Sequence, residues 1–154
     1  MKTKLFIILL LFTILLIGCG DDSVTDPENN VIENKGSITL SGAASGNYDA
    51  KIGFINNGNA VTITVADKEG KVSFVLSSNQ VKTGTFTIPD EFEITYTNTK
   101  DTVMADFHTG TVTVNDISTS SVNGSFTGSG YPLFLPTWTI DSTKTVNATA
   151  TFSL

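Results

Sequence analysis

The amino-acid sequence predicts an all-β protein with a single antiparallel β-sandwich domain, and it leaves a closed up-and-down barrel open as the alternative. Apolar and polar residues alternate strictly in several runs, among them 61–65, 92–96 and 145–154. Such alternation is typical of a strand with one face on a core and the other in water. Turn-forming Asn, Asp and Gly residues separate the runs. No run after Cys19 shows the apolar period of a helix.

The turn residues divide the chain into short strands. Asn56-Asn57-Gly58-Asn59 and Asp67-Lys68-Glu69-Gly70 are typical hairpin loops, because Asn, Asp and Gly tolerate a positive φ angle. We expect about ten strands at this spacing of turns, over residues 36–43, 47–55, 60–66, 71–77, 84–88, 92–97, 102–107, 111–117, 121–130 and 144–154.

The β domain is expected to span residues 36–154. A chain of about 120 residues buries roughly two-thirds of its unfolded surface, which is enough for one core without disulfides or metals. The residues expected inside are apolar residues of the alternating runs: Val61, Ile63, Val65, Val72, Phe74, Leu76, Phe86, Ile94, Phe107, Val112, Val114, Phe126, Val146 and Phe152.

A basic and then apolar segment precedes the domain. Lys2 and Lys4 are followed by an apolar run over residues 5–17, the pattern of a secretory signal. As a helix this run is about 20 Å long, too short for the ~30 Å hydrocarbon core of a bilayer. The run ends in Leu16-Ile17-Gly18-Cys19, and this segment resembles the lipobox of bacterial lipoproteins.

The resemblance implies that residues 1–18 are a cleaved signal peptide and that Cys19 carries the lipid. Two or more acyl chains, at about 0.8 kcal/mol per buried methylene, anchor a protein stably. The alternative is an ordinary signal peptide with an incidental cysteine. Cys19 is the only cysteine, so disulfides, zinc–cysteine clusters and a thiol nucleophile are excluded from the folded domain.

Residues 19–35 are expected to be the lipidated cysteine and a flexible acidic tether, because they are polar and show no strand or helix period. Gly20-Asp21-Asp22 resembles the acidic export signal of Bacteroidetes-type surface lipoproteins. The resemblance implies the outer face of the outer membrane, with a periplasm-facing location as the alternative. A calcium site on the acidic residues Asp21, Asp22 and Asp26 is the other interpretation, and a solvated linker is preferred to it.

The charge of the chain restricts its partners. The formal net charge is −6, and loss of Lys2 and Lys4 with the signal takes it to −8. The chain contains no arginine, the side chain best suited to phosphate and carboxylate ligands. Nucleic-acid binding is therefore excluded. The partners that remain are the lipid membrane, through Cys19, and a glycan or an envelope protein.

The His, Asp and Glu residues of this sequence are not spaced as a catalytic or metal site requires. We therefore predict no catalytic residues, no metal and no other cofactor. Asp106 and the only histidine, His108, share one face of a strand, but a metal site normally needs three or four protein ligands. Glu91 and Glu93 are spaced like paired carboxylates, yet both are expected on the wet face of their strand, where nothing separates their pKa values. Both pairs are interpreted as surface groups.

Glycine and threonine patterns are interpreted structurally. The glycine-rich residues 124–130 precede no helix that could hold a phosphate, so they predict a strand with a bend. Thr-x-Thr pairs resemble the arrays of ice-binding proteins, but they lie at irregular intervals and are interpreted as a solvent face: 62/64, 85/87, 95/97, 111/113, 137/139 and 149/151.

Residues 131–140 break the alternation and contain two prolines and the only tryptophan. Proline cannot donate a ladder hydrogen bond, so this segment is expected to be a pinned loop between the last two strands. It either covers one end of the core or displays aromatic side chains to a glycan or protein partner. The candidate binding surface is Tyr131, Phe134 and Trp138.

A second resemblance concerns the mature chain. Residues 84–87, 110–114, 122–126 and 150–152 are similar to motifs of small, uncharacterised lipoprotein domains from Bacteroidetes-type bacteria. This implies an antiparallel sandwich and no activity. The function expected from the sequence is a membrane-anchored, surface-exposed and non-enzymatic lipoprotein that binds a partner or serves the envelope structurally. A lipocalin-like carrier of a lipophilic ligand and a hydrolase are the alternatives.

Overall fold

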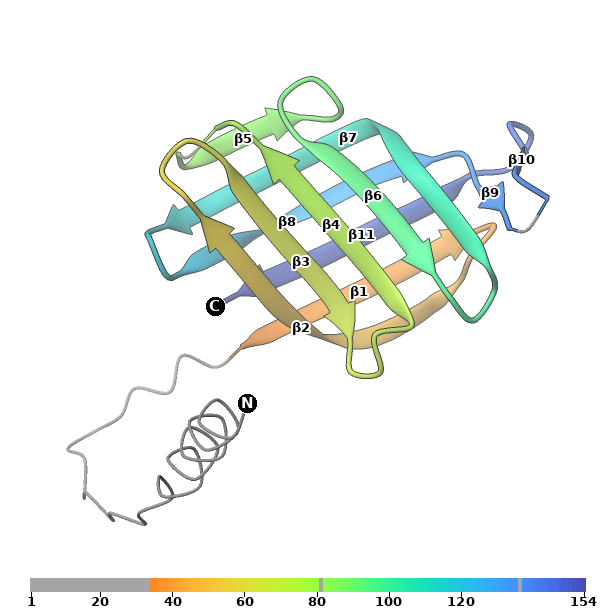
Figure 1. The fold of residues 1–154 in the computed structure, drawn as a ribbon, viewed down its shortest axis with the longest axis horizontal. Helices are drawn as coiled ribbons and strands as arrows, with labels where there is room; N and C mark the ends of the chain where they lie inside the picture. Colours follow the sequence, from red (N-terminus) through yellow and green to blue (C-terminus); the bar gives the residue numbers. More distant parts are fainter. Residues whose placement is uncertain (1–33, 81, 136) are drawn as a thin grey trace, which may run out of the picture. The chain divides into compact units, whose positions relative to one another are not determined.

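The structure is a computed structural model that describes residues 34–80, 82–135 and 137–154 (Figure 1). Every regular element in these ranges is a β-strand, which confirms the all-β prediction. The predictions for the signal peptide, for Cys19 and for nearly all of the tether lie outside the described residues. No helix among the described residues is long and apolar enough to cross a membrane.

Eight long strands follow one another around a closed ring, and each is antiparallel to its neighbours. In chain order they are β1 (Lys35–Gly42), β2 (Gly46–Asn56), β3 (Val61–Asp67), β4 (Val72–Ser78), β6 (Glu93–Asn98), β7 (Val103–Ile117), β8 (Val122–Gly130) and β11 (Val146–Ser153). The ring closes between the first and last strands, where Lys35 pairs with Ser153 and Gly42 with Val146. The closed up-and-down barrel is therefore the observed architecture.

Three short strands lie outside this ring. The first, β5 (Gly84–Thr87), pairs with the second half of β7. The other two, β9 (Leu133–Phe134) and β10 (Thr139–Ile140), form a hairpin that attaches to the first half of β7. The 131–140 segment is thus a small hairpin outside the barrel wall rather than the loop that the prolines predict.

Two strands change neighbours along their length, which explains why the sequence favoured a sandwich. The start of β2 pairs with β1 and its end with β3, while the start of β7 pairs with β6 and its end with β8. In Figure 1, β3, β4 and β6 cross in front of β8, β11 and β1. The two groups pack face to face as in a sandwich, but β2 and β7 join them by hydrogen bonds. The sandwich expectation is therefore wrong.

The core fills the inside of the barrel. Every residue that the alternation placed inside is buried. The Phe74 ring lies at its centre, 4.9 Å from Phe126, 5.1 Å from Tyr96 and 5.7 Å from Phe107 between ring centroids. These separations are typical of favourable tilted and edge-to-face ring pairs. Aromatic side chains from four strands therefore occupy the interior.

Outward-facing hydroxyl groups form rows across the strands. Residues paired across neighbouring strands make one row of Thr85, Thr113, Ser125, Thr151 and Ser37, and a second row of Thr87, Thr111, Thr127, Thr149 and Thr39. Neighbouring hydroxyl groups of a row form hydrogen bonds, for example between Ser37 Oγ and Thr151 Oγ1, which lie 2.9 Å apart. The Thr-x-Thr pairs 85/87, 111/113 and 149/151 are irregular along the chain but in register in the sheet. They face outward, as a threonine-rich solvent face does.

Candidate binding surface

The β9–β10 hairpin is held against the rim of the barrel by backbone hydrogen bonds. The Leu135 amide donates to the Thr102 carbonyl at 2.8 Å, and the Asp141 amide donates to the Pro132 carbonyl at 3.0 Å. The Phe134 ring is half-buried and packs against the core. Lys144 lies over this ring, with Nζ 5.7 Å from its centroid. Phe134 therefore covers the end of the core.

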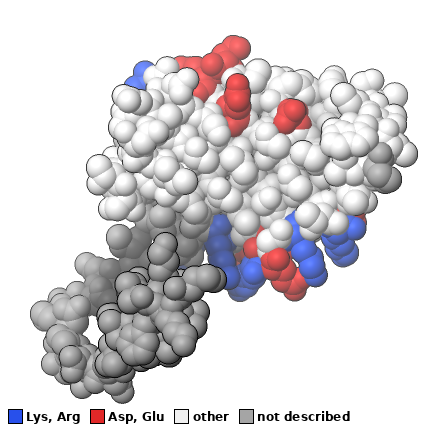
Figure 2. Space-filling model, viewed as in Figure 1, with Lys and Arg blue, Asp and Glu red and all other residues white. Residues whose placement is uncertain are grey.

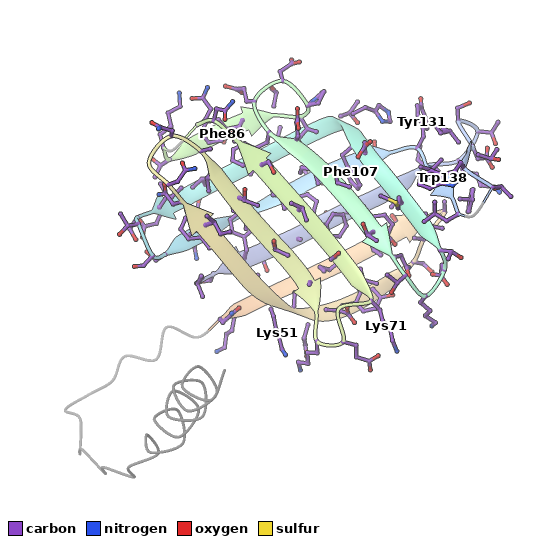
Figure 3. All side chains as sticks on the ribbon, viewed as in Figure 1. Lys51, Lys71, Phe86, Phe107, Tyr131 and Trp138 are labelled. Atoms are coloured by element: carbon purple, nitrogen blue, oxygen red, sulfur yellow. The ribbon has the colours of Figure 1, made fainter. Side chains whose placement is uncertain are left out.

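Three apolar side chains of the same segment remain exposed. The exposed fraction is 70% for Trp138, 64% for Ile140 and 41% for Tyr131. Of the two alternatives for this segment, covering the core applies to Phe134, which packs on it, and display applies to Trp138, which lies in the turn beyond it at a positive φ of 53°. Figure 3 shows Tyr131 and Trp138 at the β9–β10 end of the molecule. We call Tyr131, Trp138 and Ile140 the exposed apolar cluster.

A cleft of about 400 Å³ lies where the hairpin meets β7, and Tyr131 and Ile140 of the cluster line it, while Trp138 does not. The Tyr131 ring forms one of its walls and stacks on His108, with centroids 4.4 Å apart and an interplanar angle of 25°. Met104, Leu133 and Ile140 supply apolar walls. A cleft of this size with mainly apolar walls and a few polar groups is typical of a small binding site.

Asp106 and His108 both line this cleft, on either side of the inward-facing Phe107. Asp106 is exposed and accepts a hydrogen bond from Thr95 Oγ1 at 3.0 Å. His108 is half-buried and stacks on Tyr131. The two side chains thus contact different neighbours, and this arrangement is not that of a coupled acid–base pair.

The two glutamates lie in different environments. Glu93 is the exposed first residue of β6, as expected. Glu91 lies in the preceding turn, where its Oε2 atom accepts hydrogen bonds from the Thr87 amide at 2.9 Å and from Thr87 Oγ1 at 3.2 Å. The expectation that both project from one strand is therefore wrong, because the chain turns back on itself between Thr87 and Glu91. Glu91 holds this turn together.

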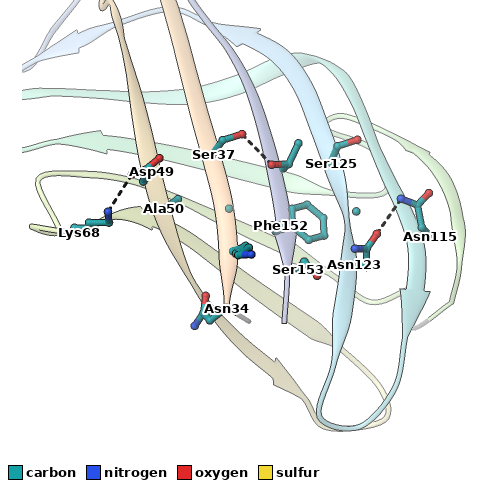
Figure 4. A pocket seen from close by; sticks show the side chains of 14 residues that line it. Asn34, Ser37, Asp49, Ala50, Lys68, Asn115, Asn123, Ser125, Phe152 and Ser153 are labelled. Carbon is teal, nitrogen blue, oxygen red and sulfur yellow. Dashed lines mark hydrogen bonds and ion pairs between the residues drawn. The ribbon is translucent and has the colours of Figure 1, made fainter. Parts of the chain in front are cut away.

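A larger hollow of about 810 Å³ lies over the outer face of β1, β11 and β8. Ser37, Thr151 and Ser125 of the first hydroxyl row line it (Figure 4). Asp49 and Lys68 form an ion pair at its edge, with Oδ2 and Nζ 3.0 Å apart. The hollow has polar, mostly uncharged side chains, whereas the cleft beside β9 has apolar ones.

Sequence reasoning found the aromatic segment but not the complete surface. It missed Met104 and Leu133 and the stacking of His108 on Tyr131, because these depend on where the hairpin docks. The one sequence signal that could have placed Ile140 on this surface was its spacing of two residues from the apolar Trp138. Within the described ranges, no three His, Cys, Asp or Glu side chains are grouped so that they could hold a metal ion.

Comparisons with protein-family models, with curated proteins and with solved structures found no match to this chain. The site must therefore be interpreted from its own geometry.

Proposed function

We propose that this protein is a membrane-anchored, non-enzymatic binding module of the bacterial envelope, attached through Cys19 and displayed on the outer membrane surface. The observation that carries the binding function is the exposure of Tyr131, Trp138 and Ile140 in one segment, two of which, Tyr131 and Ile140, line the cleft. Single exposed apolar residues are common, but grouped ones next to a cleft are characteristic of an interaction surface. Tryptophan and tyrosine are also enriched among the residues that dominate binding energy.

The start of β1 and the exposed apolar cluster lie at opposite ends of the barrel strands. Strand β1 starts at Lys35, beside the last residues of β11. Tyr131 follows the end of β8, beside the start of β11. The start of β1 thus lies at one end of these strands, and the β9–β10 hairpin lies at the other (Figure 1).

A lipocalin-like carrier is the second candidate, and the closed eight-stranded barrel favours it, because barrels of this size can hold one small ligand. The interior also contains the fully buried hydroxyl of Tyr96, which has no hydrogen-bond partner within the described residues. Burial raises the pKa of Tyr96 to about 12. The Phe74, Tyr96, Phe107 and Phe126 rings already occupy this space, so an interior ligand would have to displace them. The external cluster is therefore preferred.

The first test concerns Trp138. We expect Trp138→Ala to change the free energy of unfolding by no more than about 0.5 kcal/mol, because the side chain is exposed, and to abolish partner binding. The measurements are denaturant unfolding and binding to a glycan array and to isolated envelope proteins. The matched control is Ile55→Ser, which changes an apolar side chain that is 67% exposed on β2, away from the hairpin.

Binding that Trp138→Ala removes and Ile55→Ser leaves intact would support the proposal. Equal binding by the wild type and both variants would contradict it, since the cluster would then take no part. Destabilisation by several kcal/mol would also contradict it, because Trp138 would then belong to the core.

The second test concerns the anchor. We expect Cys19→Ser to abolish labelling by a radioactive fatty acid and to move the protein from the membrane fraction to the soluble fraction. The reason is that a thiol is needed to receive the diacylglyceryl group. Wild-type protein processed in the same cells is the control. Continued membrane association of the Cys19→Ser protein after a high-salt wash would contradict the lipoprotein assignment.

A further inference from the structure

A second, acidic hollow lies next to the cleft that Tyr131 and Ile140 line. Asp106 lines both the 400 Å³ cleft and a neighbouring hollow of about 460 Å³ that also contains Glu93 and Thr95. Thr95 pairs directly with Asp106 across β6 and β7, and Glu93 lies two residues before Thr95 on the same face of β6. Asp106 therefore borders the apolar cleft, and Glu93 borders the hollow next to it.

These carboxylates are exposed and available to a partner. Both Glu93 and Asp106 are exposed side chains. Three lysines form ion pairs with other carboxylates: Lys68 with Asp49, Lys71 with Glu69 and Lys144 with Asp141. In Figure 2, most of the lysines on this face lie at its lower edge among acidic side chains, and further acidic side chains lie at its upper part, with one lysine at the upper left.

We infer that this composite cleft binds a protein segment that carries an arginine or lysine next to an aliphatic or aromatic residue. The inference rests on the proposed binding function and adds the chemistry of the partner. An arginine or lysine has a long apolar stem and a charged end. Its stem and its neighbour would pack on Tyr131 and Ile140, while its charge would lie beside Asp106 and Glu93.

Charge complementarity favours this partner over other protein segments. An acidic segment would be repelled by Asp106 and Glu93, and by the net negative charge of the chain. A purely apolar segment would leave the carboxylates without new partners. An exposed ion pair adds little affinity by itself, so the apolar walls supply the binding energy and the carboxylates select the partner.

The experiment compares two peptides on the purified full chain in detergent. The probes are acetyl-leucyl-arginine amide and the same peptide with citrulline, which keeps the shape of arginine and removes its charge. The readout is the NMR shift of the His108 ring and of the Trp138 indole during titration. We expect saturable shifts with the arginine peptide and about three- to fivefold weaker binding of the citrulline peptide, the effect of losing an exposed ion pair.

Charge-removing variants separate this inference from the proposed function. We expect Asp106→Asn or Glu93→Gln to weaken the binding of the arginine peptide severalfold. The control Asp116→Asn, in an exposed position at the far end of β7, should bind like the wild type. Equal binding of the two peptides, no saturable shift with either, or no effect of Asp106→Asn would each overturn the inference.

A neutral oligosaccharide that shifts the same signals while the arginine peptide does not would also overturn it. Binding in that case would still depend on Trp138, so the proposed binding function would stand while the partner's chemistry would be a glycan's. Loss of Trp138-dependent binding altogether would instead contradict the proposed function.

Discussion

Replacing Phe74 by alanine is expected to lower the free energy of unfolding by about 3–5 kcal/mol, the usual cost of removing a buried phenylalanine. Phe74 is fully buried, and its ring contacts Tyr96, Phe107 and Phe126 from three other strands. Its removal leaves a cavity in the middle of the barrel that the surrounding β-strands cannot close. Urea or guanidinium unfolding, followed by circular dichroism, measures the change.

The next residue in the same strand provides the control. Val75 points outward and is 39% exposed, so Val75→Ala is expected to cost no more than about 0.5 kcal/mol. A loss of less than about 1 kcal/mol for Phe74→Ala would mean that the centre of the barrel is loosely filled. That outcome would favour the carrier candidate over the external binding surface.

The second large effect is expected for Gly110→Ala, which we predict to cost about 3 kcal/mol or more. Gly110 has a φ of 136°, and a Cβ atom there would collide with the backbone carbonyl of Thr127 in β8. A backbone oxygen cannot rotate away as a side chain can, so β7 and β8 would have to separate. The same unfolding measurement applies.

Gly58→Ala controls for backbone strain alone. Gly58 also has a positive φ, 85°, but a Cβ atom added there meets nothing within 4 Å. We expect Gly58→Ala to cost about 1–2 kcal/mol, the ordinary penalty for a left-handed conformation. Equal effects of the two substitutions would show that the contact between β7 and β8 is not tight at Gly110.

The sequence predicted which side chains lie inside because burial follows a period of two along each strand. Phe74, Phe107 and Phe126 were all placed correctly in this way. Closure into a barrel was not decided, since a sandwich and a barrel both have one buried face per strand. The pairing of β1 with β11 closes the barrel and joins the two ends of the domain. A local sequence pattern cannot predict a pairing between strands so far apart in the chain.

The site was harder to predict than the core. The composition of residues 131–140 marked the segment, but it could not tell that Phe134 is half-buried while Trp138 is 70% exposed. That difference depends on how the hairpin docks on β7. The hydroxyl rows were missed for a similar reason, because register between strands aligns residues such as Thr39 and Thr149 that are distant in the sequence.

The pairing of β1 with β11 also sets the order in which this chain can fold. At a synthesis rate of 5–20 residues per second, the last strand emerges on the order of ten seconds after the first. Until then both β1 and β8 lack a neighbour, so the ring stays open and its edges are free to pair with other chains. The closed barrel, in which β11 joins β1 to β8, is thus the last state that the chain reaches.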